Sequence, residues 1–167
     1  MARSARGGAR QRPPSRQDTR PTRPTVLKLG GELLEQPRRL RRLADAIVRL
    51  ADDAPLVVVH GGGREVDAEL ARHGIGKRSI DGIRITDVPT LSIVVAVLAG
   101  SVNTRLVAAV VTGGARAVGL TGVDSALGLV EPAPAHRTIT GRRVALGRVG
   151  RPVSNGPPRL LVDLCRQ

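Results

Sequence analysis

Two apolar segments that each end in a run of glycines constrain the fold of this chain more than any other feature. The first is VLKLGG over residues 26–31, and the second is LVVVHGGG over residues 56–63. Apolar, β-branched runs that end in glycine and lead into a helical pattern are typical of buried parallel strands in βαβ units. Neighbouring parallel strands bring their carboxyl ends to one edge of the sheet. The sequence therefore predicts two glycine turns lying side by side.

Glycine turns of this kind predict a binding site for an anion. Glycine lets backbone N–H groups approach a ligand closely, and a helix that begins at the turn directs its positive end to the same point. Neither turn has the GxxxxGK[ST] pattern or a clean GxGxxG pattern. Lys28 lies inside the first strand, two residues before its glycines. Because a buried ammonium needs an anion or a cavity, we expect Lys28 to face the bound anion as a catalytic electrophile.

The aromatic content limits both the fold and the partners. The chain has 167 residues, which fits one domain with a sizeable core, and it contains no Phe, Trp or Tyr. Its core must be built from Leu, Val, Ile and Ala, and such a core suits α/β layers. Single-stranded nucleic acids are bound largely by stacking on aromatic side chains. The composition therefore weighs against nucleic-acid binding.

The basic charge is concentrated near the amino terminus. The net charge is +13, and residues 1–24 hold seven arginines and one acid, Asp18. We expect this Arg/Pro-rich arm to be disordered. A solvated tail is the favoured interpretation, and an arm that binds nucleic acid or an acidic partner is the alternative.

Few features point to a membrane or an oxidising compartment. The single cysteine, Cys165, rules out an internal disulfide and lies in an apolar, helix-like segment, so we interpret it as a core residue. No run approaches the roughly 18 consecutive apolar residues of a membrane span, and the amino terminus has no apolar signal region. We expect a cytoplasmic protein that does not bind membranes.

The order of elements predicts an open, mainly parallel α/β sheet flanked by helices and carrying β-hairpin insertions. Strands are expected at 25–30, 56–60 and 117–120; helices at 37–51, 63–73, 91–98, 102–111 and 159–166; a hairpin at 79–86 around Asp81-Gly82; and short antiparallel strands, 127–130 and 144–149, within 125–150. Asp87 is a candidate N-cap, and Pro37 suits a helix start.

The polar residues near these junctions indicate chemistry in which the protein positions and neutralises. Arg84 in the hairpin is a candidate clamp for a carboxylate, because its planar fork suits bidentate recognition. We interpret His60 as a structural histidine, and we leave site roles for Asn103 and Asp124 open. No Ser-His-Asp set, metal-ligand pattern or pair of acid and base carboxylates is evident. This fits phosphoryl transfer to a substrate that supplies its own nucleophile.

Five stretches together resemble the amino-acid kinase family and, within it, the acetylglutamate kinases. They are VLKLGGELLE at 26–35, LVVVHGGGREVDAEL at 56–70, DGIRITD at 81–87, VLAGSVNTRLV at 97–107 and AVGLTGVD at 117–124. In order and spacing the resemblance covers about residues 25–167. HGGG followed by the DGIRIT hairpin is more similar to an acetylglutamate kinase than to an aspartokinase or a carbamate kinase.

The resemblance implies phosphorylation of the γ-carboxylate of N-acetyl-L-glutamate by ATP with Mg²⁺, in arginine biosynthesis. It implies a homodimer formed through the helix at about 87–98. The roles it implies are a catalytic Lys28 that neutralises the transferring phosphoryl group, Gly30 and Gly31 donating N–H groups to the ATP phosphates, and Gly62, Gly63 and Arg84 binding the amino acid.

The resemblance is confined to the front half of the family pattern. The substrate-binding Asn, the organising Asp and the second catalytic Lys of the family are expected beyond Gln167. We therefore expect residues 25–167 to form the half that binds the amino acid, without the nucleotide half, and to have weak or no activity alone. A kinase of a related acidic amino acid, of the aminoadipate type, is one alternative. A non-catalytic kinase-like regulatory domain that binds N-acetylglutamate or arginine is another.

Overall fold

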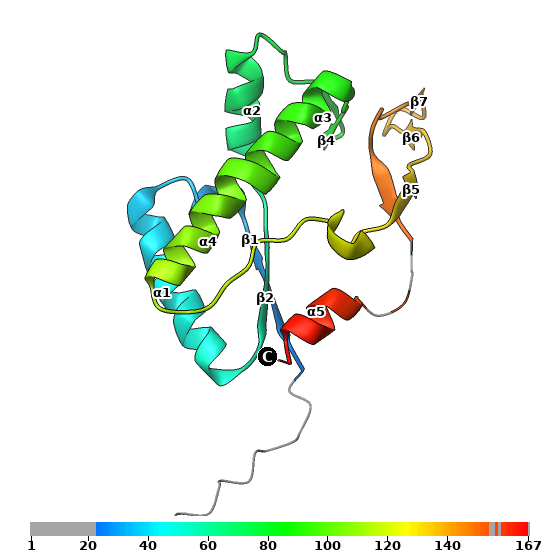
Figure 1. The fold of residues 1–167 in the computed structure, drawn as a ribbon. Helices are drawn as coiled ribbons and strands as arrows, with labels where there is room; N and C mark the ends of the chain where they lie inside the picture. Colours follow the sequence, from blue (N-terminus) through cyan, green and yellow to red (C-terminus); the bar gives the residue numbers. More distant parts are fainter. Residues whose placement is uncertain (1–22, 154–155, 157, 167) are drawn as a thin grey trace, which may run out of the picture.

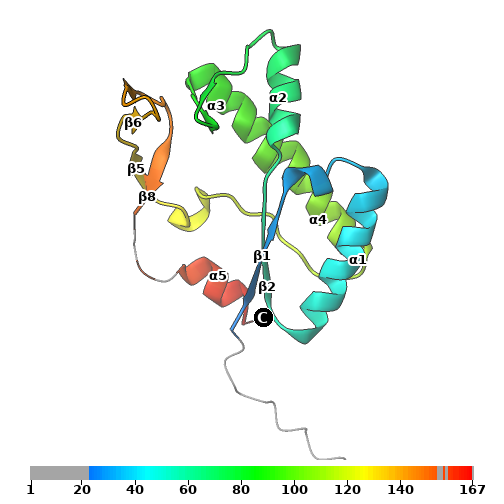
Figure 2. The ribbon, with the colours of Figure 1, turned by 180° about the vertical axis from the view of Figure 1, so that it is seen from behind.

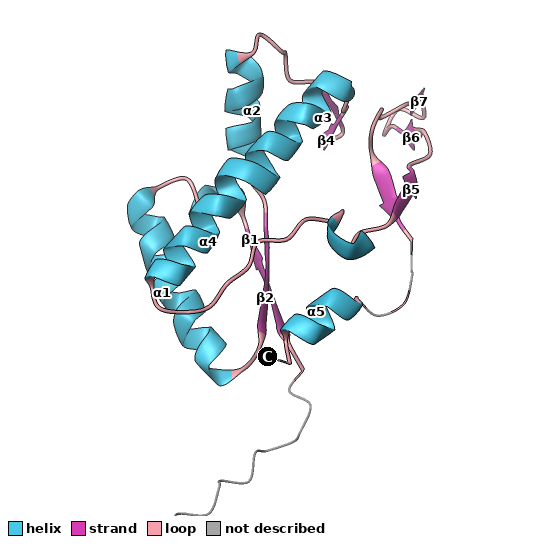
Figure 3. Cartoon of the chain, in the orientation of Figure 1, coloured by secondary structure: helices cyan, strands magenta, loops and turns pink. Residues whose placement is uncertain are grey.

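The computed structural model describes residues 23–153, 156 and 158–166, and the expected arm lies largely outside them. Helices and strands alternate along the first half, and short strands dominate the second (Figures 1 and 3). The strands are β1 (Thr25–Leu29), β2 (Leu56–His60), β3 (Ser79–Ile80), β4 (Ile83–Arg84), β5 (Val130–Pro132), β6 (His136–Arg137), β7 (Arg143–Val144) and β8 (Gly150–Pro152). The helices are α1 (Pro37–Asp53), α2 (Gly63–Arg72), α3 (Val88–Val95), the π-helix η2 (Ala96–Val102), α4 (Asn103–Thr112) and α5 (Arg159–Leu164), with short 3₁₀ turns η1 (Gly31–Leu33) and η3 (Asp124–Ala126).

The two predicted glycine-ended strands pair in parallel. Thr25 lies opposite Leu56, and the register continues to Leu29 opposite His60. Paired residues of a parallel ladder point to the same face. One face, which includes Leu27 and Val58, packs on the core, while the opposite face leaves Val26 66% exposed. Helices α1 and α4 lie on one side of this pair and α5 on the other (Figures 1 and 2).

The core contains only aliphatic side chains, as the composition predicts. It is formed by the buried residues Leu29, Leu34, Leu40, Ala44, Ile47, Val66, Leu70, Val97, Val102, Leu106 and Val110. Leu40, Ala44 and Ile47 recur along α1 at helical spacing, so one stripe of this helix is buried while its arginines face outward. The predicted helix start at Pro37 and the inward positions Val66 and Leu70 of α2 are confirmed.

The expectation of two separate helices over 91–111 is wrong. Residues Val88–Thr112 form one continuous helix, in which α3, η2 and α4 follow each other without a break. A glycine inside a helix destabilises it by about 1 kcal/mol. Burial of apolar side chains on both sides of the glycine can offset this cost. Val97 and Val102 flank Gly100 and are both buried, so packing carries the helix across this point, with a π-helical turn over Ala96–Val102. Asp87 caps its start, as predicted, by accepting a hydrogen bond from Thr90 N at 2.9 Å.

This long helix is also apolar. Among the described residues it is the one segment long and apolar enough to cross a bilayer, judged by length and composition alone, and 28% of its apolar window is buried. Helices in the cores of water-soluble proteins meet the same criterion. Here the helix packs through Val97, Val102, Leu106 and Val110 onto the core shared with α1 and α2.

The hairpins agree with prediction in kind but differ in their bounds. Asp81 and Gly82 have φ of 49° and 79°, as the predicted two-residue turn between β3 and β4 requires. In the second half β5 pairs with β8 and β6 pairs with β7, both antiparallel. The expected strand 127–130 is wrong for its first three residues, because the hydrogen bonds of this stretch close a turn, with Gly128 N donating to Gly122 O at 2.7 Å.

The predicted third strand at 117–120 is also wrong. These residues pair with no strand in the described part of the chain, and Val118 is 64% exposed. A strand is stabilised by its ladder, and β2 is hydrogen-bonded only to β1 among the described strands. The backbone of Gly119 instead lies against the side-chain amide of Asn103, leaving no room for a β-carbon. The α/β class is confirmed, and the wider parallel sheet stays a prediction.

An open cavity of about 1280 Å³ separates this segment from β2. Its walls come from β2, the long helix, the stretch 114–122 and α5. Its apolar lining includes Val57, Leu98, Leu106, Leu120 and Leu164. The sheet edge formed by β2 thus faces a hollow and not a neighbouring strand.

Candidate functional site

The two glycine turns are in direct backbone contact, as the sequence predicts. A β-carbon built on Gly31 would lie 2.8 Å from Gly62 Cα and 2.9 Å from Gly62 N. Real β-carbons do not approach backbone this closely, so the turn after β1 can touch the turn after β2 only with glycine at position 31. The register that places Leu29 opposite His60 brings the two strand ends to the same level. The contact is the centre of the candidate site.

The second turn opens directly into a helix. Gly62 is the N-cap of the ten-residue α2, and Gly63 is its first residue. A β-carbon on Gly63 would meet no atom within 4 Å, so the space beside the amino end of α2 is open. The unpaired N–H groups of a helix start and its positive dipole end favour an anion.

The first turn differs from expectation. Gly30 leads only into η1, and Leu34 N donates back to Gly31 O at 2.9 Å. The full helix α1 begins later, at Pro37. Only the second turn therefore carries the dipole of a helix, and the first supplies backbone groups from a tight 3₁₀ turn.

Lys28 lies on the exposed face of β1, opposite Val59. The expectation that Lys28 is a buried ammonium in need of an anion is therefore wrong, because this face of the strand is not covered by the described residues. Among them no ion pair or hydrogen bond engages its ammonium. A lysine in this position is available to an anion bound beside the glycine turns.

Arg84 is attached to the second turn through α2. Its Nη2 donates a hydrogen bond to Asp67 Oδ1, and its side chain is 21% exposed. Asp67 lies four residues after Gly63, which is about 6 Å along a helix axis. The contact thus joins the predicted carboxylate clamp to the helix that begins at the predicted glycine site.

Asp67 is a residue that sequence reasoning missed. Burial acts to raise the pKa of its carboxyl, but hydrogen bonds from Lys77 and Arg84 and the charges of both cations outweigh burial and hold the pKa below its usual value. The signal in the sequence was a carboxylate on the polar side of the helix that follows the glycines. Its partners Lys77 and Arg84, ten and seventeen residues further on, were not evident from local spacing.

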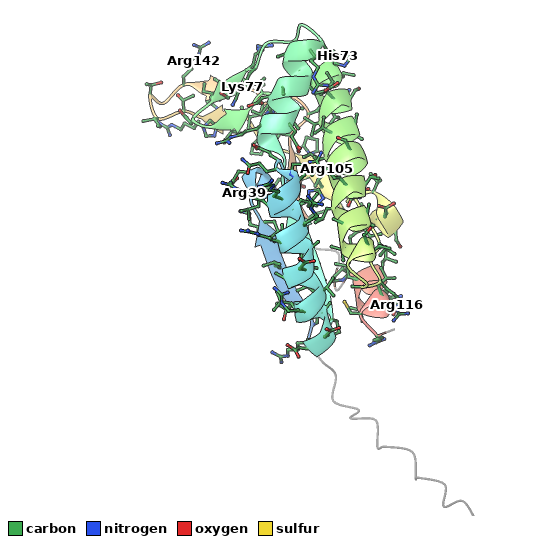
Figure 4. The ribbon with its side chains drawn as sticks, turned by 90° about the vertical axis from the view of Figure 1, so that its left-hand side faces the viewer. Arg39, His73, Lys77, Arg105, Arg116 and Arg142 are labelled. Carbon is green, nitrogen blue, oxygen red and sulfur yellow. The ribbon has the colours of Figure 1, made fainter. Side chains whose placement is uncertain are left out.

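A second ion pair, which sequence reasoning also missed, connects the segments that follow the two glycine turns. Arg105 on the long helix donates through Nη2 to Glu65 Oε1 and to the carbonyl of Leu34, the latter at 3.3 Å. Figure 4 shows Arg105 where the start of α1 and the start of α2 approach the long helix. Arg105 therefore links the end of η1 to the first turn of α2. An arginine inside an apolar helical pattern was the available signal.

The remaining candidates show local roles. His60 is half-buried, and its Nδ1 lies 3.4 Å from Gly61 O. Asp124 accepts hydrogen bonds from the backbone N–H and hydroxyl of Thr121, and these bonds lower the pKa of its carboxyl. Asn103 contacts Gly119. The residues that the structure describes contain no group of three His, Cys, Asp or Glu side chains able to hold a metal ion.

The arrangement can bind an anion and orient a carboxylate, with a free lysine nearby. Backbone N–H groups come from the second turn, positive charge from Lys28 and from the Arg84 guanidinium. The described site offers no nucleophile and no acid–base pair. It therefore suits a reaction between two anionic substrates whose charges must be neutralised while they are held together.

Comparison with known proteins gives a consistent result. The model described as "Amino acid kinase family" matches residues 23–148. Proteins named acetylglutamate kinase are 41% identical over 125 residues in Methanopyrus kandleri (75% of this chain, 46% of that protein), 34% over 141 residues in Endomicrobium trichonymphae (84% and 51%) and 40% over 144 residues in Roseiflexus sp. (84% and 50%). The chain thus spans about half the length of these curated relatives.

A solved structure is similar as well. The N-acetylglutamate synthase from Neisseria gonorrhoeae, complexed with coenzyme A and L-arginine, matches with a TM-score of 0.59 and 28% sequence identity. The match covers 87% of this chain and 34% of that one. Similarity thus extends beyond proteins named as kinases to one named as a synthase.

Proposed function

The chain belongs to the amino acid kinase family, and on that premise we propose that it binds N-acetyl-L-glutamate and takes part in phosphorylating its γ-carboxylate with MgATP. This is the acetylglutamate kinase reaction of arginine biosynthesis. Because the chain spans about half the length of its curated relatives, we assign residues 25–167 to the half that binds the amino acid. The nucleotide half belongs to another segment or chain.

The observation that carries the proposal is the backbone contact between Gly31 and Gly62 at the carboxyl ends of two paired strands. It supports a single site in which one turn faces the ATP phosphates and the other faces the acceptor. Gly30 and Gly31 are assigned to the phosphates. Gly62 and Gly63 are assigned to the reacting end of the amino acid, where the open amino end of α2 favours negative charge.

The chemistry follows from these positions. A γ-carboxylate oxygen attacks the γ-phosphorus of ATP, a new O–P bond forms, the bond to ADP breaks, and an acyl phosphate and ADP result. Negative charge is spread over the transferring phosphoryl oxygens, so neutralisation is the main contribution of the protein. Lys28, exposed and unpaired among the described residues, is assigned to those oxygens. Arg84 is assigned to the α-carboxylate, and Mg²⁺ arrives with ATP as part of the substrate.

The assembly we propose is a cytoplasmic homodimer with a wider, mainly parallel sheet completed outside the described residues. The long helix leaves Val88 56% and Val95 54% exposed. Exposed apolar side chains on this helix support pairing of two copies through it. The basic arm at residues 1–24 is assigned no role in the site.

Calorimetry and acyl-phosphate trapping test the proposal. The 167-residue chain should bind N-acetyl-L-glutamate more tightly than 2-aminoadipate. Hydroxylamine converts an acyl phosphate to a hydroxamate, and with MgATP this signal should be low for the chain alone and lost in Lys28→Met. Arg41→Met, which removes an exposed charge on α1, is the matched control and should keep the signal. Absence of binding, or trapping that survives Lys28→Met, would overturn the proposal.

A second function is favoured by the synthase structure. A kinase-like module that binds an effector without phosphoryl transfer would share the fold and the glycine turns. Such a module would bind N-acetylglutamate or arginine and give no hydroxamate, even when the nucleotide half is supplied. Arginine binding to this chain, together with that negative result, would favour the regulatory function over the kinase.

A further inference from the structure

Three charged side chains meet between α2 and the β3–β4 hairpin. The carboxylate of Asp67 is divided between two cations: Oδ1 accepts from Arg84, and Oδ2 accepts from Lys77 Nζ at 2.8 Å. Lys77 is 56% exposed and lies at the hairpin end of the molecule (Figure 4), whereas Arg84 is 21% exposed. The contact to Arg84 is therefore the better shielded of the two.

In this group the charges do not cancel, and one hydrogen-bond donor has no acceptor. Two cations and one carboxylate leave one positive charge in excess. Arg84 Nη1 is buried and has no hydrogen-bond partner among the described residues. Buried donors in native proteins almost always find an acceptor, because an unpaired one loses its hydrogen bond to water without a replacement. A surplus charge beside an unpaired donor points to an acceptor that is itself an anion.

Resting on the function proposed above, we propose that Asp67 is a positioning residue: it holds the Arg84 guanidinium, whose side chain is 21% exposed, in the orientation that meets the α-carboxylate of the ligand. Arginine has several rotatable bonds, and ordering it on binding opposes affinity. A hydrogen bond from Nη2 to Asp67 orders the guanidinium in advance, so that less side-chain freedom is lost when the ligand binds.

The direction of the effect separates positioning from simple electrostatics. Asp67 is an anion close to the place assigned to an anionic ligand. If it only contributed charge, its removal would raise the positive potential and tighten binding. If it positions Arg84, its removal must weaken binding, and only for ligands that carry the α-carboxylate. Selectivity between an acid and its amide therefore reports on the role.

The experiment measures the affinity of the full 167-residue chain for N-acetyl-L-glutamate and for its α-carboxamide by calorimetry. The wild-type chain should prefer the acid by about 100-fold, because the amide leaves the guanidinium without its ionic partner. Asp67→Ala should reduce that preference to about tenfold by weakening binding of the acid alone. Glu69→Ala is the matched control, since it removes an acid from the same helix that pairs with Arg72 and His73.

The outcomes separate the two proposals. Unchanged or tighter binding of the acid by Asp67→Ala, with wild-type selectivity intact, would overturn positioning by Asp67 and leave the ligand assignment standing. A wild-type chain that binds neither ligand, or both equally, would overturn both. Asp67→Asn, whose amide oxygen can still accept from Arg84, should show an intermediate preference. Circular dichroism of each variant checks that lost affinity is not lost folding.

Discussion

Two arginine–carboxylate contacts on the same helix have opposite characters. Arg105 meets Glu65 in the first turn of α2, and Arg84 meets Asp67, two residues further along the helix. At the first contact one cation, Arg105, meets one carboxylate, Glu65. Arg105 Nη2 also donates a hydrogen bond to the Leu34 carbonyl. The second contact has a surplus cation and an unpaired guanidinium nitrogen.

The two contacts also differ in the buried side-chain atom that each leaves without a hydrogen bond. At the first contact the buried atom without a described partner is an acceptor, Glu65 Oε2, and it lies at the positive end of α2, close to Gly62. The positive end of the helix dipole favours this negative charge. At the second contact the unpaired atom is a donor, Arg84 Nη1, and the carboxylate beside it, Asp67, is shared with Lys77. Ion pairing alone therefore does not identify a binding residue, but the balance of charge and hydrogen bonds around it does.

The largest effect is expected from breaking the first contact. Arg105→Met leaves Glu65 without its cation and the Leu34 carbonyl without its donor. Because the Arg105 side chain is 40% exposed, this should lower the free energy of unfolding by about 2 kcal/mol and the melting temperature by roughly 6 °C. Thermal unfolding measures this, with the exposed Arg72→Met as control. A change of less than about 1 kcal/mol would mean that Arg105 does not hold the two turns together.

Breaking the second contact should affect binding more than folding. In Arg84→Met the carboxylate of Asp67 keeps Lys77 as its partner, so the free energy of unfolding should change by about 1 kcal/mol or less. The affinity for N-acetyl-L-glutamate should fall at least about 100-fold, because a charge-assisted contact is lost. Calorimetry and urea unfolding on the same preparation measure both. Equal losses in the two variants would remove the distinction between the contacts.

Acid should weaken the second contact in a defined window. The pKa of Asp67 is lowered in the folded chain, so its ionised form stabilises the fold above the unfolded value of about 3.9, and this contribution is lost as the pH falls through the lower folded pKa. The difference in unfolding free energy between wild type and Asp67→Asn should therefore be constant above pH 5 and shrink below about pH 4. A difference that persists unchanged at pH 2 would contradict this.

The smallest effect is expected from breaking the exposed ion pair between Lys77 and Asp67. Lys77→Met removes a cation that is 56% exposed, and pairs at such sites contribute about 0–1 kcal/mol. The loss of stability should be below about 0.5 kcal/mol and should vanish in 1 M salt, where exposed charges are screened. Urea unfolding at two salt concentrations tests this. A large, salt-independent loss would show that Lys77 is as integral as Arg105.

Local patterns were sufficient for much of the fold. The strand ends, the helix start at Pro37, the Asp81-Gly82 turn and the Asp87 cap follow from short-range preferences of the backbone, and all are present. The segment around Gly100 and the stretch 117–120 were predicted wrongly, because burial of Val97 and Val102 and the availability of a ladder partner are decided by distant residues.

The candidate site divides in the same way. By itself the sequence determined that two glycine turns end two neighbouring strands, that Lys28 precedes one of them and that Arg84 sits in a hairpin, since these depend on residue types and spacing along the chain. Only the tertiary structure decided that Gly31 touches Gly62, that Lys28 faces outward and that Asp67 holds Arg84. Contacts between residues seventeen or more positions apart arise when helices and hairpins pack, and no local preference encodes them.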